Sequence, residues 1–203
     1  MAISTYTELK TAVNNWLARS DLADRAPEFI ALAEARMNRE LETRSQETRV
    51  TATLVAGDQY VSLPSDVRQV RSVRLNTSPI TNLAFMTPLV IDRTHAATGQ
   101  GKPINYSVIG GEIYFRPIPD DGYEAEIFYT ASLESLSDSV ATNTILQRNP
   151  DVYLSGTLVE AFTFLMDDQR RGQHDAIFQR GLESIQRDDD RVRYPSALTL
   201  SIN

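Results

Sequence analysis

Few side chains in this sequence have types and spacings that could support catalysis or metal binding. The chain has two histidines, His95 and His174, and no cysteine. A zinc site on a helix needs ligands at a recognisable spacing such as H-E-x-x-H, and the sequence does not contain it. The lack of cysteine excludes disulfides, thiolate metal sites and a cysteine nucleophile. We therefore expect neither histidine to be a metal ligand or a catalytic residue.

Two groups of acidic residues could also support chemistry. Asp188-Asp189-Asp190 could hold a divalent cation, but it lacks the alternating spacing and the glycine of a calcium loop, so we expect a solvated helix end. Asp120-Asp121, with Glu124 and Glu126, could suggest hydrolysis by two carboxylates. However, Asp120-Asp121 is explained by the turn that it forms with Gly122, and Glu124 and Glu126 share one strand face, which we expect to be wet.

The motifs of common enzyme classes are missing from the sequence. It has no G-x-S-x-G, no phosphate-binding loop and no dinucleotide fingerprint. The sequence therefore predicts no enzyme, no cofactor and no metal. A hydrolase would have to lose its activity when His174 or Asp120 is mutated.

Charge and composition narrow the choice of partners. The 203 residues carry 27 acidic and 20 basic side chains, and residues 101–203 hold 16 of the acids and 9 of the bases. This chain offers no basic face of the kind that nucleic-acid binding requires. The bases are 18 arginines and two lysines, Lys10 and Lys102. Arginine forks favour protein interfaces, although a genome rich in G and C would give the same bias.

The elements that would position these residues begin with two helices. Thr5 and Glu8 are spaced as a capping box for a helix to Arg19, in which Trp16 is expected to be a core anchor. A second helix starts near Pro27, with Asp24 as N-cap, and its apolar stripe repeats every three or four residues. Its other face is highly charged. That face is either simply solvated, or its Arg and Glu residues pair with another subunit.

Two further helices follow near the C-terminus. Asn149 and Pro150 cap a helix to about Met166, and Asp167 or Asp168 caps the last one. Gly172 and Gly181 weaken that helix, each by about 1 kcal/mol relative to alanine. Two helices at each end of the chain are expected to form one four-helix unit.

The middle of the chain changes to the period of two that is typical of strands. Gly110-Gly111 and Asp121-Gly122 predict the turns of an antiparallel meander. The segment from Val67 to Leu75, VRQVRSVRL, predicts a helical turn leading into a strand with Arg71, Val73 and Leu75 on one face. The predicted fold is α+β, with a discontinuous helical domain (1–46 and 144–192), a mostly antiparallel β insertion (47–143) and an extended C-terminal tail (193–203).

Targeting signals are not evident in the sequence. It has no apolar run near the ~18 residues that a membrane span needs, and its first twenty residues read as a polar amphipathic helix. We therefore expect no signal peptide, and we expect the protein to be made and used in a cytoplasm or inside an assembly.

Three segments carry a resemblance to a known family. The run PEFIALAEARMNRELETRSQE, the segment Leu63-Pro64-Ser65-Asp66 and the later Asn149-Pro150-Asp151-Val152-Tyr153-Leu154 resemble the head-to-tail adaptor (connector) proteins of tailed bacteriophages. The resemblance covers nearly the whole chain. It implies a virion protein of the phage neck, made in the host cytoplasm, which forms a ring of twelve copies beneath the portal. Its partners would be the portal protein, neighbouring copies and a tail nozzle or other tail component, with genomic DNA passing through an acidic lumen without specific binding.

Two groups of residues are candidates for these contacts. Arg36, Arg39 and Arg44 are predicted to contact a neighbouring subunit or the portal. Leu198, Leu200 and Ile202 alternate with polar residues like a strand seeking a sheet edge, although a frayed terminus would also be ordinary. The resemblance implies that this tail clasps the portal. The alternative function is a soluble oligomeric binding module or regulator without a virion role.

Overall fold

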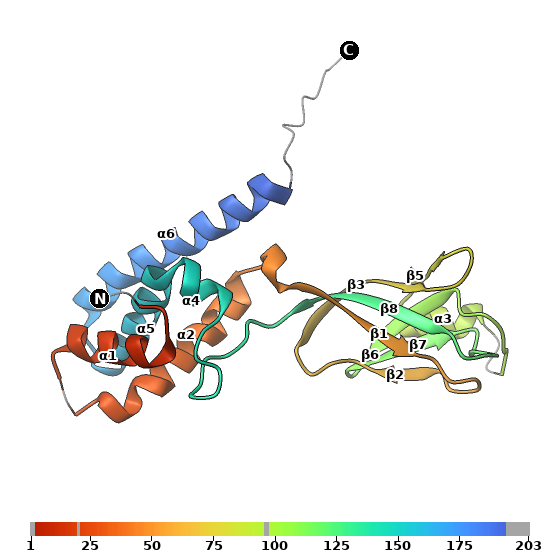
Figure 1. Ribbon diagram of the computed structural model, residues 1–203, viewed down its shortest axis with the longest axis horizontal. Helices are drawn as coiled ribbons and strands as arrows, with labels where there is room; N and C mark the ends of the chain where they lie inside the picture. The colour runs from red at the N-terminus through yellow and green to blue at the C-terminus, as the bar shows by residue number, and fades with distance from the viewer. Residues whose placement is uncertain (1–2, 20, 96–97, 194–203) are drawn as a thin grey trace, which may run out of the picture. The chain divides into compact units, whose positions relative to one another are not determined.

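The computed structural model describes residues 3–19, 21–95 and 98–193 (Figure 1). The chain divides into a helical unit, Met1–Ser45 with Leu133–Asn203, and a β unit, Gln46–Ser132. The predicted α+β class is confirmed, since the described helices accompany two mostly antiparallel sheets. The segment 133–143, which we assigned to the β insertion, belongs to the helical unit. Its backbone bonds to the helix Ala26–Glu40 (α2), where Leu133 N–H donates to the Asn38 side chain (2.6 Å).

The helical unit contains α1 (Tyr6–Leu17), α2 (Ala26–Glu40), α4 (Thr144–Arg148), α5 (Pro150–Phe164) and α6 (Asp168–Arg193). The predicted capping box of Thr5 and Glu8 is present at the start of α1. Asp24 is not the N-cap of α2. It lies inside a 3₁₀ turn, Ala23–Arg25, and Arg25 occupies the cap position.

The core of the helical unit excludes Trp16, contrary to the prediction. Leu9, Val13 and Leu17 form the buried stripe of α1, whereas the Trp16 side chain is 58 % exposed. Each residue of a helix advances by about 100°, so a stripe repeating every four residues turns Trp16 toward its margin. There its ring lies at 80° to the His174 ring, with 5.7 Å between centroids.

Helix α5 packs closely against α6 because glycines face the neighbouring helix. A Cβ on Gly156 of α5 would lie 2.7 Å from the ring of Phe178, and one on Gly181 of α6 would lie 2.5 Å from Val152. Gly172, by contrast, has nothing within 4 Å. Gly181 therefore permits the close crossing of α5 and α6. Gly172 lowers the stability of the helix and permits no close contact.

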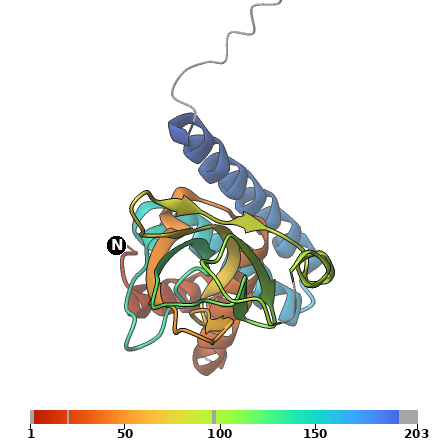
Figure 2. The ribbon, with the colours of Figure 1, turned by 90° about the vertical axis from the view of Figure 1, so that its right-hand side faces the viewer.

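The β unit is built from two four-stranded sheets. One has the order β1 (Glu47–Thr53), β8 (Glu124–Ala131), β3 (Val67–Leu75), β4 (Thr81–Asn82), and the other β2 (Tyr60–Ser62), β7 (Glu112–Arg116), β6 (Asn105–Ile109), β5 (Ala84–Phe85). Between the strands that the structure describes, all pairings are antiparallel except that of β5 with β6. Helix α3 (Pro88–Thr94) contacts β6, and Figure 2 shows it at the side of the strands. Apolar side chains of both sheets form a second core.

Strand β3 corrects the prediction of a helical turn. The whole segment is extended, but its pairing with β8 shifts register between Val67 and Gln69 and again between Val70 and Ser72. Each irregularity adds a residue, so Val67, Val70 and Val73 all face the core at a spacing of three. Arg71 is exposed and does not share the face of Val73 and Leu75.

Glu126 was expected on a wet strand face, and that prediction is wrong. Its residue is 7 % exposed, and the carboxylate pairs with Arg74 and with Arg49 Nη1 (3.1 Å). Two arginines from the neighbouring strands β1 and β3 thus cover the carboxylate, which makes its burial tolerable.

No helix in the described part of the chain is both long and apolar enough to cross a membrane. The predicted docking residues Leu198, Leu200 and Ile202 lie outside the described residues.

Candidate interaction surface

Arg36 lies at the seam between α2 and α6. Its Nη2 donates to Asp175 of α6 at 2.7 Å, and its Nε donates to Glu40 of α2 at 3.2 Å. The guanidinium also lies over the ring of Phe178, 5.1 Å from its centroid. Burial disfavours the charged guanidinium, but the bonds to the two carboxylates prevail and raise the pKa of Arg36. Within one chain, Arg36 therefore joins α2 to α6.

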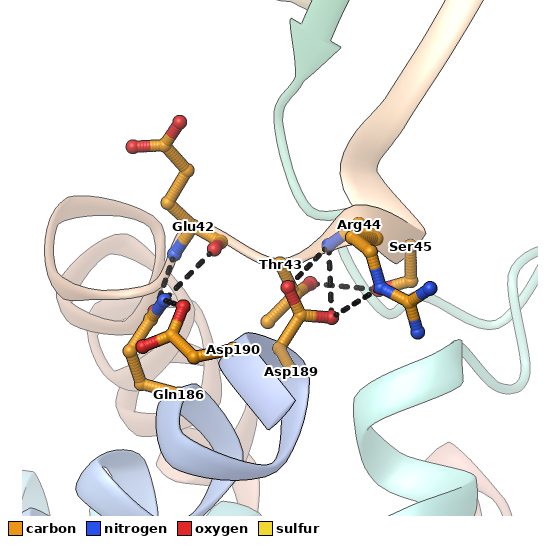
Figure 3. Close-up of polar contacts among 7 residues, drawn as sticks. All are labelled: Glu42, Thr43, Arg44, Ser45, Gln186, Asp189 and Asp190. Carbon is orange, nitrogen blue, oxygen red and sulfur yellow. Dashed lines mark hydrogen bonds and ion pairs between the residues drawn. The ribbon is translucent and has the colours of Figure 1, made fainter. Parts of the chain in front are cut away.

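Arg44 makes a second connection to α6, just beyond the end of α2 (Figure 3). Its backbone N–H donates to both carboxylate oxygens of Asp189 at 3.1 Å, and its Nε donates to one of them at 3.3 Å. The Asp189 side chain is 11 % exposed, whereas its neighbour Asp188 is 72 % exposed. The acidic run at the end of α6 is therefore not uniformly solvated, because one of its carboxylates holds the segment that follows α2.

Gln186 holds the same segment one turn earlier on α6. Its side-chain carbonyl accepts from the backbone N–H of Glu42 (3.4 Å), and its amide donates to the Glu42 carbonyl (3.3 Å), as Figure 3 shows. A recess of about 550 Å³ lies beside these contacts. Its lining includes Arg44, Arg148 and Asp188. The end of α6 and the chain after α2 thus form one polar junction.

Arg39 differs from the other two arginines. Among the residues that the structure describes, it makes no ion pair, and its side chain is exposed. It shares one face of α2 with Glu28, Leu32 and Ala35, which follow one another at spacings of four, three and four and are all exposed. Leu32 is 54 % exposed. This outer face of α2 therefore combines charged ends with an apolar centre.

Apolar side chains at the end of α5 extend the exposed surface of the helical unit. Phe164 is 48 % exposed and Met166 is 89 % exposed. The Phe164 ring lies 5.8 Å from that of Phe29 on α2 and beneath the guanidinium of Arg25, at 4.7 Å. Phe164 is thereby held against α2. Large apolar side chains exposed together in this way are typical of protein interfaces.

The exposed apolar and charged side chains of the helical unit are typical of a protein with contact surfaces. A family model described as SU10 adaptor protein matches residues 4–200. The chain belongs to the SU10 adaptor protein family. Members are head-to-tail adaptors of phages, which implies portal and tail partners and a place at the virion neck. No curated protein matches the chain.

The SU10 adaptor family is structural and is not a known enzyme class. In this member His174 is half-buried between Trp16 and Phe162, whose ring stacks on it at 5.4 Å, and burial lowers its pKa. His95 Nε2 bonds to Asn105 Oδ1 (2.8 Å) in the other unit. In the described ranges no three His, Asp or Glu side chains come together as a metal site would need.

From the sequence we predicted contacts for Arg36, Arg39 and Arg44, but not the exposed apolar surface of Trp16 and Phe164. The sequence predicted Trp16 as a core anchor, and it led to no prediction for Phe164. A signal was present for Phe164, because Phe162, Phe164, Leu165 and Met166 together exceed what one helix face can bury. The partners Asp175 and Asp189 were not foreseen, since they lie far from the arginines along the chain.

Proposed function

We propose that copies of this adaptor assemble side by side as a ring beneath the portal, twelve to match it. The ring extends the DNA conduit after packaging and offers the docking surface for the tail. The family membership supports an adaptor role, and the outer face of α2, with Leu32 and Arg39, carries the proposal that helical units pack against one another. An exposed leucine between charged ends suits a contact with an apolar centre and a polar rim.

In this proposal, Arg36 and Arg44 shape the contact surface rather than contact the partner themselves. Both are tied to α6 within one chain, so they fix the position of α2 and of residues 41–45 for a neighbour or the portal to meet. Arg39 is the arginine whose exposed guanidinium would contact the neighbouring subunit or the portal. Leu198, Leu200 and Ile202 are proposed to dock on the portal as an added strand.

The surplus of acidic side chains supports the proposal for the conduit. Residues 101–203 hold 16 acidic and 9 basic side chains, and an acidic wall repels a passing duplex instead of holding it. We further propose that the protein is made in the host cytoplasm and joins the virion as a low-order species.

The first test is the mass of the purified protein, alone and mixed with the portal ring of its own particle, by native mass spectrometry. A low-order species that becomes a stoichiometric ring on the portal supports the proposal and gives the copy number. A chain lacking residues 195–203 should lose portal binding while keeping its melting temperature.

The opposite result is equally definite. A mass unchanged by portal would refute the adaptor ring for this chain, and intact portal binding without residues 195–203 would refute tail docking. A thermal-shift screen with metals and nucleotides then tests the binding-module alternative, since a ligand of the folded state raises the melting temperature.

A further inference from the structure

The outer face of α2 carries a row of exposed side chains that can pair with a second copy of itself. Glu28, Leu32, Ala35 and Arg39 follow one another at spacings of four, three and four, so they form one seam along the helix. All four residues are exposed. The opposite side of α2 is buried in the core of the helical unit, so this face is the one left for a partner.

The order of the side chains along this face is symmetric about its middle. Glu28 and Arg39 lie equally far from the midpoint between residues 33 and 34, and so do Leu32 and Ala35. Two copies of α2 that run antiparallel about a two-fold axis at this midpoint would therefore place Glu28 of each copy against Arg39 of the other. Because a helix rises by about 1.5 Å per residue, the two ion pairs would lie about 16 Å apart, one at each end of the contact.

The sizes of the two central side chains fit the same arrangement. About this axis Leu32 of one copy lies opposite Ala35 of the other, so a large side chain meets a small one on both sides of the axis. Ala31, which is also exposed, lies one turn before Ala35. Small side chains at a helix contact allow the axes to approach to about 8 Å, where Leu32 can pack against the facing helix. The contact would thus have an apolar centre and charged ends.

The charged ends are available for such a contact. Among the residues that the structure describes, Arg39 forms no ion pair. Glu28 forms one with Arg25, but its length of 3.9 Å and the exposure of both side chains make it weak. A parallel pairing would instead place Glu28 beside Glu28 and Arg39 beside Arg39, and it would align the two helix dipoles. Charge therefore favours the antiparallel pairing.

We propose that two free copies of this adaptor pair through the outer face of α2 as a symmetric antiparallel dimer. The contact covers about three turns of one helix from each copy, which is small for a protein interface, so the dimer is weak and exchanges readily. A two-fold contact closes on two copies and cannot be repeated around a ring. The dimer therefore covers the face that the proposed ring uses, and it has to open before the ring forms. This last step rests on the proposed function, whereas the dimer itself does not.

Sedimentation equilibrium of the full chain alone tests the pairing, at concentrations up to about 200 µM because the interface is small. The wild type should show a reversible equilibrium between monomer and dimer. Glu28→Arg or Arg39→Glu should each weaken the dimer by about tenfold or more, since the two-fold axis makes each substitution act at both ends. The double variant should dimerise within about threefold of the wild type, because both ion pairs return with their signs exchanged.

A mixture of the two single variants tests the same pairing without the double variant. The Glu28→Arg chain has two positive ends on this face, and the Arg39→Glu chain has two negative ends. Each should remain monomeric where the wild type dimerises, while the mixture should form a dimer with one copy of each. Native mass spectrometry distinguishes this mixed dimer by its mass.

Two exposed leucines provide a matched pair of variants for the apolar centre. Leu32 is 54 % exposed on α2, and Leu89 is 61 % exposed on α3 of the β unit. Leu32→Glu should weaken the dimer by about tenfold or more, and Leu89→Glu by less than about twofold. Melting curves by circular dichroism show that each variant is folded.

A wild-type chain that stays monomeric over the whole concentration range would overturn the proposal, and this result requires no variant. A double variant no better than the single ones, or equal effects of Leu32→Glu and Leu89→Glu, would overturn it as well. The portal is absent from all these measurements. A dimeric chain that does not bind the portal would therefore refute the proposed function and leave the dimer standing, whereas a monomer that forms the ring would refute the dimer alone.

Discussion

Tyr153 of α5 donates its hydroxyl hydrogen to the carboxylate of Glu34 on α2, at 3.1 Å, inside the core of the helical unit. The same oxygen of Glu34 accepts the backbone N–H of Leu136 at 2.8 Å. Asn143 in turn donates to the Tyr153 hydroxyl (2.6 Å) and caps α4 through Leu146 N–H (2.9 Å). One buried carboxylate therefore organises the chain as it returns from the β unit to the helices.

The first prediction concerns the pH dependence that Glu34 imposes. Burial raises the pKa of Glu34 above its usual value, although its hydrogen bonds oppose this. The folded state then holds the proton more tightly than the unfolded chain, so the stability from Glu34 is complete at low pH and is lost as the pH rises through the folded pKa. Glu34→Gln keeps an acceptor and removes the charge. We expect the melting temperature of Glu34→Gln, relative to that of the wild type, to increase as the pH rises from 4 to 8.

Glu8 provides a control with the opposite sign. Hydrogen bonds from the backbone and side chain of Ser4 lower the pKa of this exposed carboxyl in the capping box of α1. Its stabilisation is present above the unfolded pKa and is lost as the pH falls through the folded one. The melting temperature of Glu8→Gln, relative to that of the wild type, should therefore decrease as the pH rises. A Glu34→Gln difference that stays constant with pH would contradict the first prediction.

The second prediction separates the glycines of the α5–α6 crossing from the others. Gly156→Ala should lower the free energy of unfolding by about 1–3 kcal/mol, because the buried ring of Phe178 must shift to admit the new Cβ. Gly172→Ala on α6 meets nothing and should raise it by up to about 1 kcal/mol. Urea denaturation measures both. Equal effects from the two variants would show that the close approach at Gly156 is not needed.

Local patterns in the sequence predicted much of the fold. The capping box of Thr5 and the spacing of Phe29, Ile30, Ala33 and Met37 located α1 and α2, since these signals depend on neighbours within a turn or two. The turn at Gly110-Gly111 was equally local, and both glycines have positive φ, of 57° and 93°. A type of turn that requires positive φ restricts the residues that can form it, so the sequence reveals it.

What the sequence did not reveal depends on residues distant along the chain. The two register shifts of β3 are defined against β8, and from the sequence alone the repeated valines resembled a helical turn. Glu126 is buried only because Arg49 and Arg74 flank it from two other strands. At the candidate surface, the types of Arg36 and Arg44 suggested contacts, but not that Asp175 and Asp189 of the same chain make them.

The third prediction tests the junction after α2. Asp189→Ala removes the acceptor of the Arg44 backbone N–H and should cost about 1–2 kcal/mol of stability. It should also speed cleavage by trypsin after Arg44, because residues 41–45 lose one of their holds on α6. The matched control is Asp188→Ala. The Asp188 side chain is exposed, and its one ion pair among the described residues, with Arg191, is long at 3.6 Å and contributes little to stability. If both variants were cut at the same rate, Asp189 would not be what holds this segment.

The last prediction distinguishes the two arginines of α2 that face different neighbours. Arg39 is exposed without an ion pair among the described residues, so Arg39→Glu should leave the melting temperature of the isolated chain nearly unchanged while weakening the assembly formed on the portal by about tenfold or more. Arg36→Glu would instead place a carboxylate against Asp175 and Glu40, and should lower the melting temperature before any partner is added. Native mass spectrometry and thermal melts on the same samples give both readings. A ring that forms normally with Arg39→Glu would remove the outer face of α2 from the contact and leave assembly to other surfaces of the helical unit.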